Sequence, residues 1–430
     1  MAILNIGKRG IASGKSPIPP DLTKALLAAL VPDPNDQPDV LESDIVFIAR
    51  FMVRELQQSR AILTSILSST YKSHCLPDER ILWFMTAIAG PLTESANISI
   101  DRIVTALITA KVLADDCKEG DRRLLAIRSI FCLLGCLTFL YRPEPVDKST
   151  ALDIQMQDCS SFTTRSQQMQ GSSRPFFEVV NVFNALGDLR TKQVSSDTSY
   201  AESRHATRQA LLHPSHFNAA VLTKFGKVTI VWVDSIGAHL DFDAGTKKLS
   251  LFRLPSFIRV QSSDGALLPL CYSQYEKARD DRSTCDIAGL AREVLDTYSL
   301  LFGNDRRSKA VYRKLMLKAS SDGMVDPLLD DLCGLTPWHW ASINLSPPRP
   351  SIDADLLFPI LSARMMKLQV YIESQGARGL RALYRDQRDS YQWWTFWAVI
   401  WLGGLNLLFA FTQNVLGSLQ VAYAIKALNK

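Results

Sequence analysis

The chain has 430 residues, of which 47% are hydrophobic and 21% are charged, and its net charge is +5. This composition excludes an intrinsically disordered chain and allows a sizeable core, with two domains besides any membrane segment. The small positive charge suits an anionic lipid surface as well as a nucleic acid, so charge alone excludes neither partner.

Residues 1–42 are rich in prolines and predict a flexible segment. Residues 1–20 lack the apolar run of a secretory signal peptide, and their lack of acidic side chains leaves a mitochondrial-type leader as an alternative. Residues 10–16 read GIASGKS and resemble the end of a phosphate-binding loop. The spacing is one residue short, and prolines follow where the helix should begin, so we interpret this motif as a chance match.

Residues 43–142 predict a helical bundle. Apolar side chains recur at helical spacing in four stretches, which are Asp44–Tyr71, Arg80–Ala89, Ile100–Val112 and Arg122–Tyr141. Ser99 precedes the third stretch and is a candidate N-cap. The uncharged part of the fourth stretch, Ser129–Tyr141, is too short to cross a bilayer, so we expect a central core helix there.

Residues 143–175 lose this periodicity and predict a linker or a mobile surface loop. Residues 176–377 then predict an α+β domain. Alternating apolar residues over about 219–260 predict three or four short antiparallel strands, with a hairpin turn at Asp243–Lys247. Helical spacing surrounds this small sheet at Phe176–Leu189, Ile287–Leu301 and Ile360–Ile372.

The last part of the sequence is typical of a membrane anchor, because no charged side chain lies between Ser390 and Ile425. Residues 393–413 supply the roughly 20 apolar residues that cross a bilayer, and residues 414–430 predict an amphipathic continuation. A long buried core helix is the alternative. The predicted anchor residues are Trp393, Trp394, Trp397, Trp401, Leu405, Leu408 and Phe411.

Residues 378–392 form a basic juxtamembrane segment. Its four cations are Arg378, Arg381, Arg385 and Arg388. They face only Asp386 and Asp389, and such a basic excess favours the cytosolic side of a membrane. We therefore expect a single-pass protein with its body in the cytosol, in a membrane that the sequence does not specify.

Three segments resemble a family of uncharacterised filamentous-fungal proteins that end in a single hydrophobic anchor. They contain HLDFDAGTKKLSLFRLPSF, LLFGNDRRSKAVYRK and YRDQRDSYQWWTFWAVIWLGG, within Trp232–Phe257, Glu293–Arg313 and Tyr384–Phe411. The resemblance covers the second half of the chain and only weakly the first, and Ile258 stands where that family often has cysteine. It implies a helical body with a small sheet and a C-terminal anchor, and it transfers no catalytic residue.

One internal run of cations predicts an amphipathic basic helix. Its members are Arg306, Arg307, Lys309, Arg313, Lys314 and Lys318. Apolar residues interrupt the run at helical spacing. The run could dock on an acidic surface, such as anionic headgroups or an acidic partner, and a solvated helix face is the alternative.

Other polar groups do not define a site. His213 and His216 lack nearby ligands that would complete a metal set, and a surface or turn pair is the simpler interpretation. Asp322, Asp326, Asp330 and Asp331 lack the spacing of a calcium loop and suit loop and cap positions. Residues 338–340, Trp-His-Trp, are either a partner platform or buried against the bundle.

The cysteines give no nucleophile that the sequence supports. All eight are scattered, without the close pairs of a zinc site, so reduced thiols in the cytosol are expected. Cys132 and Cys136 are four residues apart in an apolar stretch, where cysteine acts as a small buried hydrophobe. No Gly-x-Ser-x-Gly motif is present.

We therefore predict a mostly α fold, namely a helical bundle with a small antiparallel β-meander insert and one C-terminal transmembrane helix. The leading hypothesis is a tail-anchored interaction or scaffold protein. Its partners are the lipid bilayer and other membrane proteins, with no cofactor, no specific nucleic-acid binding and no identified small-molecule substrate. The alternative is a membrane-tethered enzyme, with an acid/base site drawn from Asp234, Asp241, Asp243 and His239.

Overall fold

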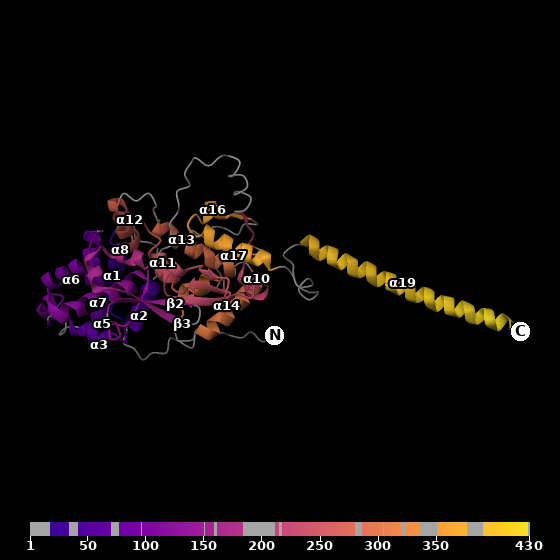
Figure 1. Cartoon of the computed structure of the whole chain (residues 1–430), viewed down its shortest axis with the longest axis horizontal. Helices are drawn as coiled ribbons and strands as arrows, with labels where there is room; N and C mark the ends of the chain where they lie inside the picture. The colour runs from indigo at the N-terminus through magenta and orange to yellow at the C-terminus, as the bar shows by residue number, and fades with distance from the viewer. Residues whose placement is uncertain are drawn as a thin grey trace. The chain divides into compact units, whose positions relative to one another are not determined.

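The computed structural model of the chain describes a mostly helical protein with small sheets and one long apolar helix near the end of the sequence (Figure 1). This confirms the predicted fold class. The described residues are 18–33, 42–69, 77–95, 97–149, 151–158, 161–183, 211–214, 217–279, 286–303, 305–319, 324–334, 351–375 and 390–428. Residues 1–369 form one compact unit and residues 370–430 form a second.

The first unit begins with the expected helices, drawn in indigo to purple in Figure 1. They are α1 (Pro20–Leu30), α2 (Glu42–Glu55), α3 (Arg60–Ser65), α5 (Pro77–Glu94), α6 (Ile100–Thr109), the 3₁₀ turn η2 (Asp115–Lys118) and α7 (Gly120–Thr138). The structure corrects one expectation here, because α1 lies within residues 1–42. Leu22, Leu26 and Leu30 are buried at helical spacing, and this packing holds the segment as a helix.

The central core helix is confirmed. Every residue of α7 from Ser129 to Thr138 is buried, and the helix ends at Phe139 in the left-handed conformation, with φ of 50°. The predicted cap of α6 is also confirmed, since the Ser99 hydroxyl accepts a hydrogen bond from the Arg102 amide at 3.2 Å. Such a cap satisfies one amide that the helix leaves unpaired.

Residues 143–175 correct a second expectation. They contain strands instead of a plain loop, namely β1 (Arg142–Pro143), β2 (Leu152–Asp158) and β3 (Ser161–Gln167), in an antiparallel sheet with β2 in the middle. Leu152, Asp153 and Ile154 of β2 are all buried. Residues 164–166 of β3 are exposed, and an edge strand of this kind accommodates the polar residues that had predicted a linker.

Three short strands lie within the predicted region 219–260, but residues 219–224 and 255–260 are helical and one pairing differs from the expectation. The region contains β5 (Thr229–Val233), β6 (Phe242–Asp243) and β7 (Lys248–Phe252), in the order β5-β7-β6. The pair β6–β7 is antiparallel around the predicted turn, whereas β5 runs parallel to β7. The chain reverses direction through the 3₁₀ turn η5 (Ile236–Ala238), which lies between β5 and β6. It reverses again at the turn between β6 and β7, so β7 runs in the same direction as β5.

The remaining helices of the first unit are drawn in magenta to orange in Figure 1. They are η3 (Met169–Ser173), α8 (Phe176–Val182), α10 (Ala219–Lys224), α11 (Pro255–Val260), α12 (Leu267–Arg279), α13 (Ile287–Tyr298), the π-turn η6 (Ser299–Gly303), α14 (Arg306–Ala319), α15 (Pro327–Leu332), α16 (Ala354–Leu357) and α17 (Ser362–Ser374). A further short pair joins β4 (Leu211–Leu212) to β8 (Ile352–Asp353). The helix α2 of the bundle contacts α11 and α15, so the bundle and the α+β region share one compact unit.

Candidate membrane anchor and charged pocket

The helix α19 (Ser390–Leu428) is 39 residues long and forms most of the second unit. Its stretch Trp394–Lys426 is long and apolar enough to cross a membrane, and none of its residues is buried. At about 1.5 Å per residue, these 33 residues span about 50 Å, whereas the hydrocarbon core of a bilayer is about 30 Å thick.

Five of the seven predicted anchor side chains are exposed. Trp394 and Trp401 are 67% and 68% exposed, and Leu405, Leu408 and Phe411 are also exposed. Trp397 is half-buried, and the side chain of Trp393 lies outside the described part. Residues 414–428 continue the same helix, as expected. The arginines 378, 381, 385 and 388 lie outside the described residues.

The basic helix α14 presents its cations on the side opposite its buried residues. Ser308 and Tyr312 are buried, and the Ser308 hydroxyl donates to the Asn218 side chain at 3.2 Å. The exposed cations are Arg306, Arg307, Arg313 and Lys314. Lys309 is half-buried, with its Nζ close to Gly334, and the side chain of Lys318 is not described. The predicted basic face is therefore present, and its docking role stays a prediction.

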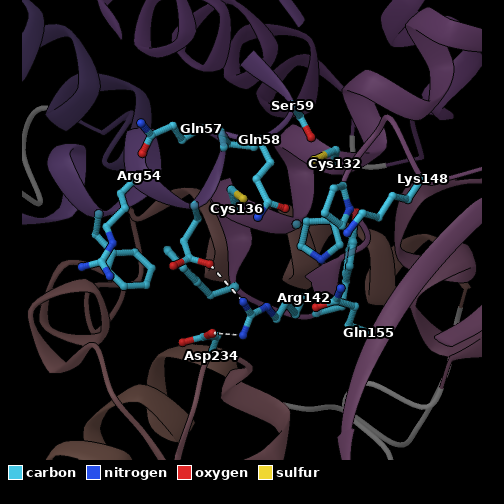
Figure 2. A pocket seen from close by; sticks show the side chains of 18 residues that line it. Arg54, Gln57, Gln58, Ser59, Cys132, Cys136, Arg142, Lys148, Gln155 and Asp234 are labelled. Carbon is cyan, nitrogen blue, oxygen red and sulfur yellow. Dashed lines mark hydrogen bonds and ion pairs between the residues drawn. The ribbon is translucent and has the colours of Figure 1, made fainter. Parts of the chain in front are cut away.

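The first unit contains a pocket of about 560 Å³ between α2, α7 and the start of β1 (Figure 2). Its wall combines apolar rings, thiols and charged groups. The lining residues that carry a formal charge are Arg54, Glu55, Arg142, Lys148 and Asp234. Three of these are cations and two are acids. Arg54 and Lys148 form no ion pair with any residue that the structure describes, so the lining carries an excess of positive charge.

Two acids and two arginines form a closed network at the pocket wall. The Arg142 guanidinium donates to Asp234 at 2.9 Å and to Glu55 at 3.4 Å, as the dashed lines in Figure 2 mark. Arg253 also pairs with both acids, and its contact with Glu55 is 3.3 Å long. Arg253 lies over the Phe51 ring at 4.6 Å. Each acid therefore has two cationic partners, which links α2 and β1 to the residues directly after β5 and β7.

The two thiols at the pocket floor are poor nucleophiles. Cys132 and Cys136 lie one turn apart on α7, and both point towards the pocket in Figure 2. Burial raises the pKa of Cys132 to about 12 and the pKa of Cys136 well above its usual value. A thiol with a raised pKa stays protonated near neutral pH and reacts slowly. The prediction that these cysteines are small buried hydrophobes is confirmed.

The structure does not bring together the four residues of the enzyme hypothesis. Only Asp234 lines the pocket, where two arginines hold it. His239 is fully buried, contacts the Thr297 hydroxyl at 2.8 Å, and has its pKa lowered to about 3 by burial and then by Arg364. Asp241 is exposed, and Asp243 caps the β6–β7 turn by accepting from the Gly245 amide at 2.9 Å.

The remaining motifs have structural roles or lie outside the described part. Asp326 is buried at the N-cap of α15 and accepts from the Ser256 amide and hydroxyl, and Asp330 accepts from Tyr312. His213 is exposed. No group of three or more metal-binding side chains occurs within the described residues. The motif 10–16, the triplet 338–340, His216 and Asp322 fall outside them.

Comparison with known proteins adds no relative: no known family, no curated protein and no solved structure matches this sequence.

The sequence patterns did not predict the charged network, because its members contact one another only after folding. Glu55 lies 87 residues before Arg142 and 198 residues before Arg253. The only local signal was the presence of charged residues at the edges of apolar stretches.

Proposed function

We propose that α19 anchors this protein in a membrane and that the protein acts there by interaction with other macromolecules. The observation that carries the proposal is the 33-residue apolar stretch, which contains no buried residue. Soluble proteins rarely expose apolar patches larger than a few hundred Å², since water contact with such a surface is unfavourable. Lipid can cover such a helix without leaving backbone N–H and C=O groups unpaired, because the helix pairs them internally.

The proposed orientation places the first unit in the cytosol. Its support is the basic excess of residues 378–392, together with free cysteines, which suit a reducing compartment. Asn97 is exposed, and residues 97–99 and 344–346 are glycosylation sequons. Expressed in microsomes, the full chain should show no endoglycosidase-sensitive mass shift, whereas a copy with a sequon appended after Lys430 should show one. Glycosylation of Asn97 or Asn344 would contradict the proposed orientation and place the first unit on the lumenal side.

Membrane attachment itself is tested by flotation. The full chain should float with phospholipid vesicles, and a chain that stops before Ser390 should remain in the dense fractions with its body folded. The physical reason is that truncation removes the apolar helix and leaves the core of the first unit intact. A truncated chain that floats as well as the full chain would contradict the anchor.

The interaction role is supported by the exposed cations of α14, which are suited to an acidic surface. Proximity labelling in cells should give a set of neighbours that shrinks in the double variant Arg306→Ala with Arg313→Ala. A matched control is Lys24→Ala with Lys277→Ala, which removes the same charge from other exposed positions. Equal neighbour sets in both variants would show that α14 is only a solvated face.

The pocket supports a second candidate function, the binding of a small anionic molecule. Its volume falls within the range of about 300–1,000 Å³ that is usual for small-molecule sites, and Arg54 and Lys148 form no ion pair with the described residues. Phosphate or citrate should raise the melting temperature of the full chain in detergent. The double variant Arg54→Ala with Lys148→Ala should lose this rise, while Lys24→Ala with Lys277→Ala should keep it.

A further inference from the structure

One face of α19 carries two rows of residues that repeat every seven positions. Small residues form the first row, which consists of Gly403, Ala410, Gly417 and Ala424. Carboxamides form the second row, three positions further on, which consists of Asn406, Gln413 and Gln420. Seven residues are close to two turns of an α-helix, so each row runs along the helix and the two rows are neighbours. The tryptophans 394, 397 and 401 lie on the opposite face.

Nothing in the described structure explains this face. A Cβ added at Gly403 or at Gly417 would meet no atom within 4 Å, so the chain's own packing does not require small residues there. The three carboxamide side chains are exposed and form no hydrogen bond with the described residues. This face therefore has the composition of a helix-packing surface, but no described residue packs against it.

A membrane makes the carboxamides costly to leave alone. Every window of about 20 residues between Trp394 and Lys426 contains Gln413 together with Asn406 or Gln420. Whichever part of α19 occupies the hydrocarbon core, at least two carboxamides lie within it. Lipid tails offer neither donors nor acceptors, and polar residues in membrane helices are usually found facing a partner.

We infer that α19 pairs in parallel with α19 of a second copy of this chain, through the small residues and the carboxamides. This inference rests on the proposed membrane anchoring. All copies insert with one orientation, so a parallel pair in register brings each carboxamide to its own counterpart. A carboxamide both donates and accepts, and it is therefore complementary to itself. The small residues allow the two backbones to approach closely, and the seven-residue repeat favours a left-handed crossing.

The test uses the full chain in phosphatidylcholine vesicles, with one half of the molecules carrying a donor dye and the other half an acceptor. Energy transfer is measured while the vesicles are diluted with lipid. Energy transfer between wild-type chains should persist on dilution. Ala410→Leu should lose it at a lipid dilution at least about tenfold lower than the wild type does, because the larger side chain separates the backbones. Replacing Asn406, Gln413 and Gln420 together by leucine should have a similar effect.

Two matched controls make the same change on other faces of α19. Ala422→Leu makes the same substitution as Ala410→Leu, and Gly404→Leu places a leucine at a glycine that lies off both rows. Both controls should retain wild-type energy transfer. Equal loss in Ala410→Leu and Ala422→Leu, or no loss in either, would overturn the proposed face.

Flotation of the same samples separates the two proposals. Chains that float but show no energy transfer at any dilution overturn the self-pairing and leave the anchor intact. The partner of the carboxamide face would then be a helix of another protein. Chains that do not float overturn the anchor and the pairing together. Chains that float, transfer energy and respond only to changes on the small and carboxamide rows support both.

Discussion

The helices α7 and α19 both contain a long uncharged stretch, yet their surroundings are opposite. Residues 129–138 of α7 are all buried by the first unit, whereas the apolar window of α19 has no buried residue. The difference lies in length and in flanks, since the uncharged part of α7 is too short for a bilayer and follows Arg122, Arg123 and Arg128. Apolar character alone therefore does not tell whether protein or lipid covers a helix.

A charge placed in each helix gives the largest expected contrast. Leu134→Arg puts an unpaired cation at a site of 0% exposure in α7 and should cost more than about 4 kcal/mol, which leaves no folded first unit by circular dichroism. Leu408→Arg changes a residue of α19 that is 59% exposed. It should leave the melting of the first unit unchanged and reduce vesicle binding, since a central arginine costs about 3 kcal/mol of insertion. Equal damage to folding by both variants would remove the contrast.

The two regions should also differ in their response to pH. Burial raises the pKa of Glu293 from 4.5 to about 7, although the amides of Ile360 and Leu361 donate to it. The folded form therefore holds the proton more tightly than the unfolded form. Its contribution to stability is full below pH 4.5 and is lost as the pH rises through about 7, by about 3 kcal/mol. Asp326, with its pKa raised to about 7, acts in the same direction.

Unfolding of the full chain in detergent, followed from about pH 5 to about pH 8, measures this effect. Glu293→Gln should flatten the decline, because its amide cannot ionise. Vesicle binding should stay constant over the same range, since no charged side chain lies between Ser390 and Ile425. Stability that rises with pH would contradict the assignment to Glu293 and Asp326.

Glycine to alanine changes should differ in their effect on stability between the two helices. A Cβ at Gly135 of α7 would lie 2.7 Å from the Tyr141 ring, which stacks on Phe131 at 4.6 Å and cannot move freely. Gly135→Ala should therefore destabilise the first unit by about 1–3 kcal/mol in thermal unfolding. A Cβ at Gly404 of α19 meets nothing, so Gly404→Ala should not lower stability. An unchanged thermal stability in Gly135→Ala would show that the Tyr141 ring can move to accommodate the added methyl group.

The smallest expected effect concerns single serine hydroxyls. Ser99→Ala removes the cap of α6 and should destabilise the first unit by about 1 kcal/mol in denaturant titration. The control is Ser418→Ala in α19, whose hydroxyl donates to the Asn414 carbonyl one turn earlier and caps no helix end. The control should leave unfolding of the first unit unchanged, and an equal loss in both variants would contradict the capping role.

Local patterns predicted most of the helices but not every strand. The helical spacing of α6, α7 and α13 placed each one correctly, because a buried stripe repeats along the sequence. The β2–β3 hairpin was missed because only Leu152 and Ile154 mark its buried side among many polar residues. The parallel pairing of β5 with β7 was missed because strand direction depends on the path between strands, which composition does not encode. The fungal resemblance stays a prediction.

The candidate sites divide in the same way. The candidate membrane span was predictable because its length and summed apolarity are properties of one continuous segment. The pocket was not, because Glu55, Arg142, Asp234 and Arg253 come from separate elements. The same separation explains why His239 was an attractive candidate base in the sequence and is a buried, neutral side chain in the fold.

The amino-acid sequence by itself determined that the chain is mostly helical and that its last long helix is long and apolar enough to span a bilayer, since both properties are sums over neighbouring residues. Only the tertiary structure decided which charges meet, which carboxyl groups are buried and which apolar helix is covered by protein. The reason is that burial and ion pairing depend on distances in space, and residues up to 198 positions apart set them here.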